Sequence, residues 1–254
     1  MRSAKHDPPR RILLLCAHLL LVSALRAQER CHVEVKLLLS PEETQTAIAS
    51  LNARKERPGR VYFFDTSSLD LLSQGIIVRL RQGSSKNDLT VKTRLPNEKT
   101  LYDPSGGREK FKCQVDMSAG RGTLSYSIEN SYARPRIPET GNDVSRLLSA
   151  GQEKLLQEAQ VSIDWSRVKR IADIKSTDWK TKHQPHFQKK LALELWEWPT
   201  GKSLELSTTV GRDAGPSAYR KLQELVKAKG LSMSGNQEFK TTMVLEALTH
   251  AAAP

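Results

Sequence analysis

Basic residues recur at alternate positions in two neighbouring stretches of the chain, 75–82 and 87–94. Arg79 and Arg81 stand in the first stretch, and Lys92 and Arg94 stand in the second. Because side chains alternate between the two faces of a β-strand, each pair shares one face of its strand. Cations gathered on one surface bind anionic oxygen atoms, and arginines can do so through two parallel hydrogen bonds. The four residues predict an anion site, unless they form only the solvated face of an ordinary antiparallel sheet.

The stretch 75–94 must form a β-hairpin if these four side chains are to converge. Its two runs alternate in polarity, and a turn rich in Ser, Asn and Asp separates them, which is typical of a hairpin with one buried face. The faces opposite the cations are apolar, with Ile76, Val78 and Leu80 on the first strand and Leu89 and Val91 on the second. We therefore expect an apolar layer on one side and four cations on the other.

Other expected strands also carry charge on one face. In the run 31–39, His32, Glu34 and Lys36 alternate with apolar residues. Two later runs, 190–198 and 203–210, are joined by a Pro-Thr-Gly turn. Each carries an acid on one face of its strand, Glu194 in the first and Glu205 in the second. Carboxylates therefore occur on other expected strands of the chain.

The rest of the chain supplies further strands and several short helices. We expect strands over 60–66, 108–117 and 161–174, which brings the total to about eight. A helix is expected to begin at Ser40 with a capping box completed by Glu43, and further helices are expected from about Val144 and over 216–229 and 239–248. Residues 118–141, rich in Gly, Ser, Pro and Arg, are expected to form a long loop or an insert.

Length and charge limit the class of protein. The chain has 254 residues with 38% hydrophobic content, enough for one large β domain or two small ones, and we expect one. The formal net charge is +12, of which the first 27 residues carry +4 and the remainder +8. A basic protein prefers anionic partners. A specific nucleic-acid partner is not expected, because no basic platform with stacking aromatic residues is visible.

The N-terminal 27 residues have the layout of a secretory signal peptide. Arg10 and Arg11 end a basic region, the apolar run 12–25 follows, and small residues lie beyond it. Cleavage is expected after Ala24 or Ala27, and the alternative is an uncleaved anchor. We expect a secreted or periplasmic protein with no stable membrane anchor after cleavage.

Two cysteines remain once the signal peptide is removed, Cys31 and Cys113. In an exported chain they can form one disulfide, and they can equally remain two buried thiols. A metal site at these positions is not expected, because neither cysteine has the spacing of a zinc ligand.

The order of these motifs resembles the CYTH family, the triphosphate tunnel metalloenzymes. The matching segments, in chain order, are HVEVK at 32–36, YFFDT at 62–66, the run Leu71, Gly75, Arg79 and Arg81, LTVK at 89–92 and LELS at 204–207. The family's first strand reads Glu-x-Glu-x-Lys, and here His32 stands in place of the first acid, followed by Glu34 and Lys36. The resemblance covers about residues 31 to 245.

The resemblance implies an α+β fold, an eight-stranded antiparallel β-barrel that forms a tunnel, with helices packed outside. The signal peptide would occupy residues 1–27 and a single tunnel domain residues 28–254. The substrate would be triphosphate or polyphosphate, bound by Lys36, Arg79, Arg81, Lys92 and Arg94. Mg²⁺ or Mn²⁺ would be held by Glu34, Glu205 and Glu194, with Asp173 as a further candidate and His32 as a substitute ligand.

Two functions of different classes remain open at this point. The first is an exported, metal-dependent triphosphatase or polyphosphatase. The second is a non-catalytic module that binds polyanions and has lost the metal site. Export argues against an adenylate cyclase, whose ATP and signalling partners lie inside the cell, and no catalytic residue is assigned.

Overall fold

The computed structural model describes residues 31–83, 87–94, 101–133 and 137–251. The expected signal peptide lies outside the described residues. The elements in chain order are β1 (His32–Leu39), η1 (Pro41–Glu43), α2 (Thr44–Ser50), β2 (Arg54–Asp65), α3 (Asp70–Ser73), β3 (Ile76–Gly83), β4 (Asn87–Arg94), β5 (Lys110–Ser118), β6 (Arg121–Ser131), α4 (Gly141–Ser145), α5 (Ala150–Glu158), β7 (Lys169–Lys180), β8 (Ala192–Trp198), β9 (Gly201–Val210), η2 (Arg212–Ala214), α6 (Gly215–Ala228) and α7 (Lys240–Ala251).

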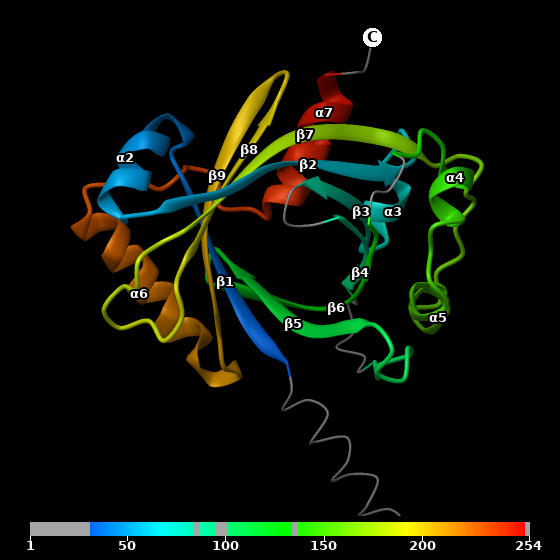
Figure 1. Cartoon of the computed structure of the whole chain (residues 1–254), viewed down its shortest axis with the longest axis horizontal. Coiled ribbons are helices and arrows are strands. Elements are labelled where there is room, and N and C mark those ends of the chain that lie inside the picture. The colour runs from blue at the N-terminus through cyan, green and yellow to red at the C-terminus, as the bar shows by residue number, and fades with distance from the viewer. Residues whose placement is uncertain (1–30, 84–86, 95–100, 134–136, 252–254) are drawn as a thin grey trace, which may run out of the picture.

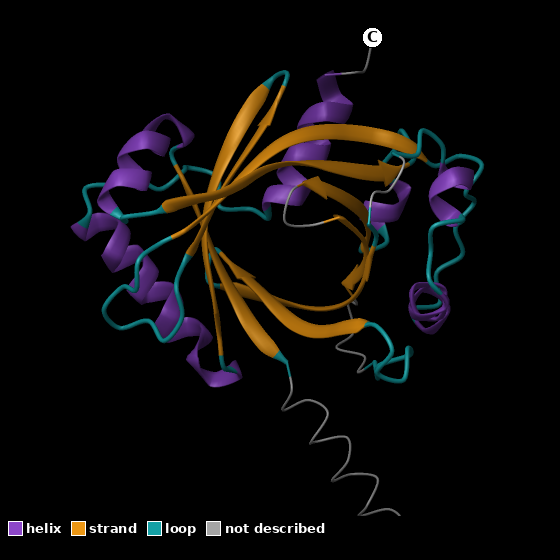
Figure 2. Cartoon of the chain, in the orientation of Figure 1, coloured by secondary structure: helices purple, strands orange, loops and turns teal. Residues whose placement is uncertain are grey.

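The strands form one closed barrel, which the orange arrows in Figure 2 outline. Their order around it is β1-β5-β6-β4-β3-β2-β7-β8-β9, and β9 closes the ring by pairing with β1. Strand β1 pairs in parallel with β5, and every other neighbouring pair is antiparallel. The expected barrel is confirmed, but the expectation of eight antiparallel strands is wrong, because the barrel has nine strands in a mixed arrangement.

The ninth strand is β6, which lies within residues 118–141. The expected loop or insert there is wrong over Arg121–Ser131, because this segment pairs on both sides, with β4 and with β5. Pairing on two edges outweighs the low strand propensity of a segment rich in Gly and Ser. The run expected as a strand over 161–174 is a strand only from Lys169 onward.

Alternation along most strands gives the barrel an apolar outer face and places the charged residues of the cavity on the inner face. On β1, Val33, Val35 and Leu37 are buried against the outer helices α2 and α6. On the far side, helices α4 and α5 cover strands β3, β4 and β6 through a second apolar cluster. Figure 1 shows the two helix pairs on opposite flanks of the barrel. The outer faces of these strands hold apolar core residues, and their inner faces carry charged residues such as Lys36 and Arg81.

Helix α7 differs from the other helices because it packs against the inner face of the barrel. Its Val244 and Leu245 are buried with Val61, Phe63 and Trp196, which point inward from β2 and β8. Figure 1 shows α7 in red behind β2 and β7 at one end of the barrel. The first turn of α7 therefore reaches the interior of the barrel.

Some local predictions need correction. The segment after Ser40 begins as the 3₁₀ helix η1 before α2, and Ser40 makes no capping hydrogen bond from its side chain. The carboxylate of Glu43 instead accepts hydrogen bonds from the backbone N–H and the hydroxyl of Ser232. The capping box is therefore absent, because a contact distant in sequence takes the glutamate. Helix α6 agrees with the prediction to within about one residue at each end.

Cys31 and Cys113 form a disulfide at the start of the parallel β1–β5 pair. The bond links residues that are 82 positions apart in sequence. It settles the alternative left open by the sequence in favour of the disulfide. Across the part of the chain that the structure describes, no helix is both long and apolar enough to cross a membrane.

Candidate functional site

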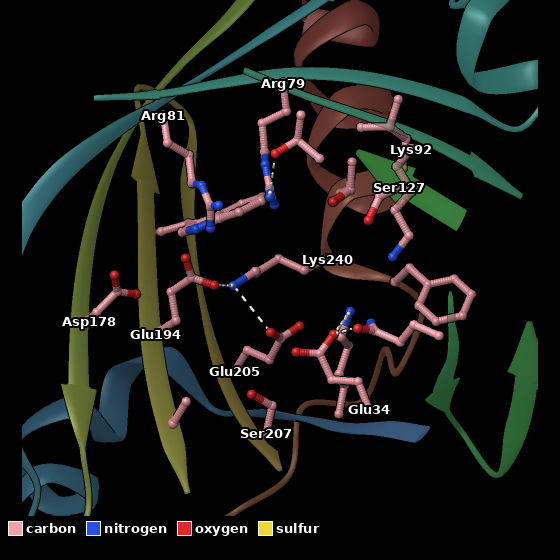
Figure 3. A pocket seen from close by; sticks show the side chains of 18 of the residues that line it. Glu34, Arg79, Arg81, Lys92, Ser127, Asp178, Glu194, Glu205, Ser207 and Lys240 are labelled. Atoms are coloured by element: carbon pink, nitrogen blue, oxygen red, sulfur yellow. Dashed lines mark hydrogen bonds and ion pairs between the residues drawn. The ribbon is translucent and has the colours of Figure 1, made fainter. Parts of the chain in front are cut away.

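A polar cavity of about 270 Å³ lies inside the barrel. This is near the lower end of the roughly 300–1,000 Å³ typical of ligand pockets, so the space suits a small ligand. Side chains from strands all around the barrel and from the start of α7 line it (Figure 3). Eight of the lining residues are cationic, namely Lys36, Arg79, Arg81, Lys92, Arg94, Lys112, Lys180 and Lys240, and five are acidic, namely Glu34, Glu129, Asp178, Glu194 and Glu205.

All five cations that the sequence assigned to anion binding reach this cavity. Lys36 comes from β1, Arg79 and Arg81 come from β3, and Lys92 and Arg94 come from β4. The antiparallel β3–β4 register places Arg79 opposite Thr90 and Arg81 opposite Asp88. These four side chains therefore lie on the same face of the sheet. The solvated-face alternative does not describe these side chains, because each is at least half-buried and lines the cavity inside the barrel.

A glycine fixes the end of the β3–β4 hairpin at the site. The backbone N–H of Arg94 donates to the carbonyl oxygen of Gly75 at 2.7 Å. Gly75 has a φ of +75°, and a Cβ atom there would lie 2.3 Å from the carbonyl oxygen of Arg94. Only glycine allows this approach, so the residue type at position 75 helps to set the position of Arg94.

Asp116 on β5 is buried behind the cavity wall, where it pairs with two of the lining lysines. Its carboxylate is fully buried and accepts a hydrogen bond from Nζ of Lys36 at 3.0 Å, and a closer one from Nζ of Lys92. Gln114 Nε2 donates to the same carboxylate and to Glu34, at 2.6 Å in each case. These contacts hold Asp116 ionised: burial opposes its charge, but the two lysines outweigh burial and lower the pKa of Asp116.

The two lysines on Asp116 differ in their number of acidic partners. Burial opposes the charge of Lys36, but Asp116 and Glu34 together outweigh it and raise the pKa of Lys36. For Lys92 burial prevails, since Asp116 is its one close carboxylate and Lys36 and Arg94 repel it, and the pKa of Lys92 falls to about 8. The charge of Lys92 is therefore the more sensitive to pH.

Arg81 is held by carboxylates on two neighbouring strands. Its Nε and Nη2 donate to Asp88 at 2.9–3.0 Å, and Nη2 also donates to Glu129 on β6 at 3.2 Å. Lys110 and Lys112 donate to Glu129 as well. Burial opposes the charge of Glu129, but these cations outweigh it and lower its pKa to about 2. Arg81 is thus occupied by internal partners.

Arg79 is the cation with spare binding capacity. Within the described residues it forms no ion pair, and its Nε is buried without a hydrogen-bond partner. Its one side-chain contact is a long one, 3.5 Å from Nη2 to Oγ1 of Thr90. Burial, and then the charge of Arg81, lower the pKa of Arg79 to about 10, which leaves it charged at neutral pH. A buried charge without a partner is costly unless a ligand supplies one.

Arg94 is the second guanidinium with an unpaired atom. Its Nε lacks a hydrogen-bond partner and lies 3.9 Å from the carboxylate of Asp116. Its guanidinium stacks over the ring of Phe239, 4.4 Å from the ring centre. Arg79 and Arg94 therefore bring to the cavity wall two guanidinium groups whose hydrogen-bond donors are not all used within the described residues.

The acids predicted to bind a metal do not assemble a metal site. Glu34, Glu194 and Glu205 line the cavity, whereas His32 is exposed at the start of β1 and is not part of the wall. Asp173 lies on the outer face, in an exposed ion pair with Arg60. In the described ranges, no group of three or more His, Cys, Asp and Glu side chains is arranged to hold a metal ion.

Lysines occupy the places that a cation would need. Lys36 pairs with Glu34, and Nζ of Lys240 lies against Glu194 and 3.5 Å from Glu205. The donor set therefore does not fit a divalent metal at these carboxylates, because their oxygens already face ammonium groups.

Several charged residues at the site were missed in the sequence, among them Asp116, Glu129 and Lys240. Asp116 continues the alternating series Lys112 and Gln114, so the same period of two predicts its inward direction. Glu129 lies in β6, which was expected to be a loop because the segment 118–141 is rich in Gly, Ser, Pro and Arg. Lys240 gives no signal in the sequence, because its position depends on how α7 packs inside the barrel.

No protein-family model and no curated protein sequence matches the chain. Several solved structures resemble it over most of its length, and two of them are as follows. A Hippeastrum protein described as an adenylyl cyclase with a dominant triphosphatase activity aligns with a TM-score of 0.55 at 20% identity, covering 87% of this chain and 96% of its own. A protein from Bacillus halodurans described as an adenylate cyclase aligns with a TM-score of 0.55 at 16% identity, covering 84% and 97%. The chain therefore shares the fold of these proteins, as the resemblance to the CYTH family implies.

Proposed function

We propose that the barrel cavity binds a linear phosphate polyanion, triphosphate or polyphosphate. The observation that carries this proposal is Arg79, which has no carboxylate partner among the described residues and whose buried Nε lacks a hydrogen-bond acceptor, in a small cavity where cations outnumber acids eight to five. Asp88 and Asp116, buried behind the wall, reduce this excess without removing it. An anion in the cavity would place charged acceptors beside the guanidinium groups of Arg79 and Arg94.

The arrangement of the cations favours a chain of phosphates over a single one. Arg79 and Arg94 come from different strands, and Lys36 and Lys92 lie on the Asp116 side of the cavity. A linear anion can reach several of these groups at once, whereas a single phosphate can reach few of them. The proposal therefore predicts an affinity that rises with the number of linked phosphates.

Calorimetric titration of the mature protein with orthophosphate, pyrophosphate and tripolyphosphate tests the proposal. We expect the dissociation constant to decrease in that order. Equal affinity for orthophosphate and tripolyphosphate would contradict a site built for a linear polyanion.

Hydrolysis of the bound anion is a second candidate function. It is favoured by the shared fold with the Hippeastrum protein, whose described activity is that of a triphosphatase. The Mg²⁺ or Mn²⁺ ion expected from the sequence belongs to this candidate. Phosphate release from tripolyphosphate, polyphosphate and ATP, measured with each metal, separates an enzyme from a binding module: the binding proposal alone predicts no release above the uncatalysed rate.

Export to an oxidising compartment is also part of the proposal. The Cys31–Cys113 disulfide supports it, because such bonds persist outside the reducing cytosol. Mass spectrometry of the protein recovered outside the cytoplasm should find an N-terminus at Leu25 or Gln28. Soluble cytoplasmic protein that still begins at Met1 would contradict export.

A further inference from the structure

Two carboxylates face each other across neighbouring strands on one side of the cavity. Glu194 on β8 is in register with Glu205 on β9, and both side chains line the interior. Like charges directly opposite each other on a sheet repel and destabilise it. The pair therefore needs a cation between or beside its members.

Lys240 supplies that cation from the first residue of α7. Its Nζ makes an ion pair with Glu194 and lies 3.5 Å from Glu205 Oε1 (Figure 3). The ammonium also lies 4.1 Å from the centre of the Trp196 ring, over its face. An ammonium group has three donors, and these neighbours surround it with two carboxylates and an aromatic face.

Packing fixes Lys240 in this position. Its side chain is only 4% exposed, which is unusual for a lysine. The helix that carries it is anchored by Val244 and Leu245, both buried against the inner face of the barrel. The lysine is therefore part of the cavity wall, unlike a surface side chain that can move away when an ion approaches.

An ammonium ion and a divalent metal ion compete for the same oxygen atoms here. Mg²⁺ binds carboxylate oxygens at about 2.0–2.1 Å and commonly uses one or two carboxylates together with substrate phosphates. Glu194 and Glu205 would be the natural pair for such an ion in this cavity, and the ammonium of Lys240 already lies against both. The ammonium group of Lys240 thus lies where a metal ion would bind these two carboxylates.

We propose that Lys240 is the built-in counter-cation of the Glu194–Glu205 pair and that the cavity consequently binds its phosphate polyanion without a divalent metal ion. This inference rests on the proposed function for the identity of the anion, but the role of Lys240 toward the two carboxylates does not depend on it. Lys240 acts here as a specificity-determining residue, because it removes the need for a metal-loaded site.

Mn²⁺ binding to the protein without any anion tests the role of Lys240 by itself. Paramagnetic resonance of Mn²⁺ is compared among the wild type, Lys240→Met and the double variant Lys240→Met with Glu194→Gln. We expect Lys240→Met to gain one Mn²⁺ site at least tenfold tighter than any site in the wild type, and the double variant to lose it. A wild type that binds Mn²⁺ as tightly as Lys240→Met, or a Lys240→Met variant that gains no site, would overturn the inference.

Anion binding gives the second readout. Calorimetry with tripolyphosphate is run in chelator and in Mg²⁺, and we expect wild-type dissociation constants within about threefold of each other. Lys240→Met should bind at least tenfold more weakly in chelator, because two uncompensated carboxylates then face the anion. Lys112→Met serves as the matched control: it removes a lining cation that pairs with Glu129, so it should weaken binding without creating an Mn²⁺ site.

The two proposals fail in different ways. Wild-type binding that is lost in chelator and restored by Mg²⁺ would overturn the inference about Lys240 and leave the proposed function standing. Wild-type protein that binds tripolyphosphate in neither buffer would overturn the proposed function, while the Mn²⁺ measurement would still decide the role of Lys240. If Lys240→Met does not fold, the wild-type measurements in chelator, in Mg²⁺ and with Mn²⁺ alone decide the question.

Discussion

Arg81 and Asp88 face each other across β3 and β4, and the guanidinium donates to both oxygens of the carboxylate at 2.9–3.0 Å. Arg79, two residues earlier on the same strand and the same face, has no such partner within the described residues. Two arginines in one motif therefore differ in role: the first is available to a ligand, and the second holds neighbouring strands together.

Replacing Arg81 should destabilise the fold. Arg81→Met leaves the carboxylate of Asp88 buried, with a side chain only 3% exposed, and without its main partner. We expect the free energy of unfolding to fall by about 3 kcal/mol, the usual scale for breaking a buried ion pair. Urea denaturation measures it, with Arg79→Met as the matched control. Arg79→Met should lose far less stability, and equal losses in both variants would show that the two arginines do not differ in this way.

Anion affinity should depend on the ionisation of Lys92. Burial lowers its pKa to about 8, so the free protein loses this charge as the pH rises through 8. Because a bound polyanion favours the protonated form, tripolyphosphate should bind about tenfold more weakly at pH 9 than at pH 7. Calorimetry on wild type and Lys92→Arg, with the same ligand at each pH, isolates the contribution of the protein. An identical pH profile in both proteins would argue against the lowered pKa.

Acid should weaken the fold through the paired carboxylates of the cavity. Burial opposes ionisation of Glu129 and Glu194, but their lysine and arginine partners outweigh it and lower both pKa values from 4.5 to about 2. Groups with lowered pKa values stabilise the folded state above their unfolded pKa, and this stabilisation is lost as the pH falls from about 4.5 through 2. Urea denaturation at pH 6, 4 and 3 should show falling stability. The loss should be less steep in Glu129→Gln, and an equal slope would contradict this assignment.

The disulfide should contribute substantially to stability. It closes a loop between residues 82 positions apart, which in the chain-entropy model corresponds to roughly 4 kcal/mol. We expect the double variant Cys31→Ala with Cys113→Ala to lose about 2–4 kcal/mol in urea denaturation and to become insensitive to reductant. Wild-type protein whose unfolding is unchanged by reductant under denaturing conditions would contradict a stabilising bond.

The charged hairpin could be predicted because a β-strand has a period of two. Once 75–94 is taken as a hairpin, alternation alone places Arg79 and Arg81 on one face and Lys92 and Arg94 on one face. The same rule places Glu34 and Lys36 on one face of their strand, and the structure places both of them, with Glu194 and Glu205, in the cavity wall. Local periodicity therefore predicts which side chains share a face of a strand.

Periodicity cannot show which inward-pointing groups become partners. The parallel pairing of β1 with β5 brings Lys36 to Asp116, which is 80 residues away in sequence. Lys240 reaches Glu194 across 46 residues only because α7 packs inside the barrel. These contacts decide which carboxylates are already paired with lysines. The alternating pattern does not reveal such pairs, so it could not show that the expected metal ligands already have lysine partners.

The most direct test of the account compares tripolyphosphate binding by two arginine variants. Arg79→Met removes a cavity guanidinium that forms no ion pair among the described residues, and Arg60→Met removes an arginine whose ion pair with Asp173 lies on the outer face of the barrel. Calorimetry should show a loss of about 1.5–3 kcal/mol in binding free energy for Arg79→Met and no change for Arg60→Met. A folded Arg79→Met variant that binds tripolyphosphate as tightly as the wild type would contradict the claim that this cavity is a polyanion site.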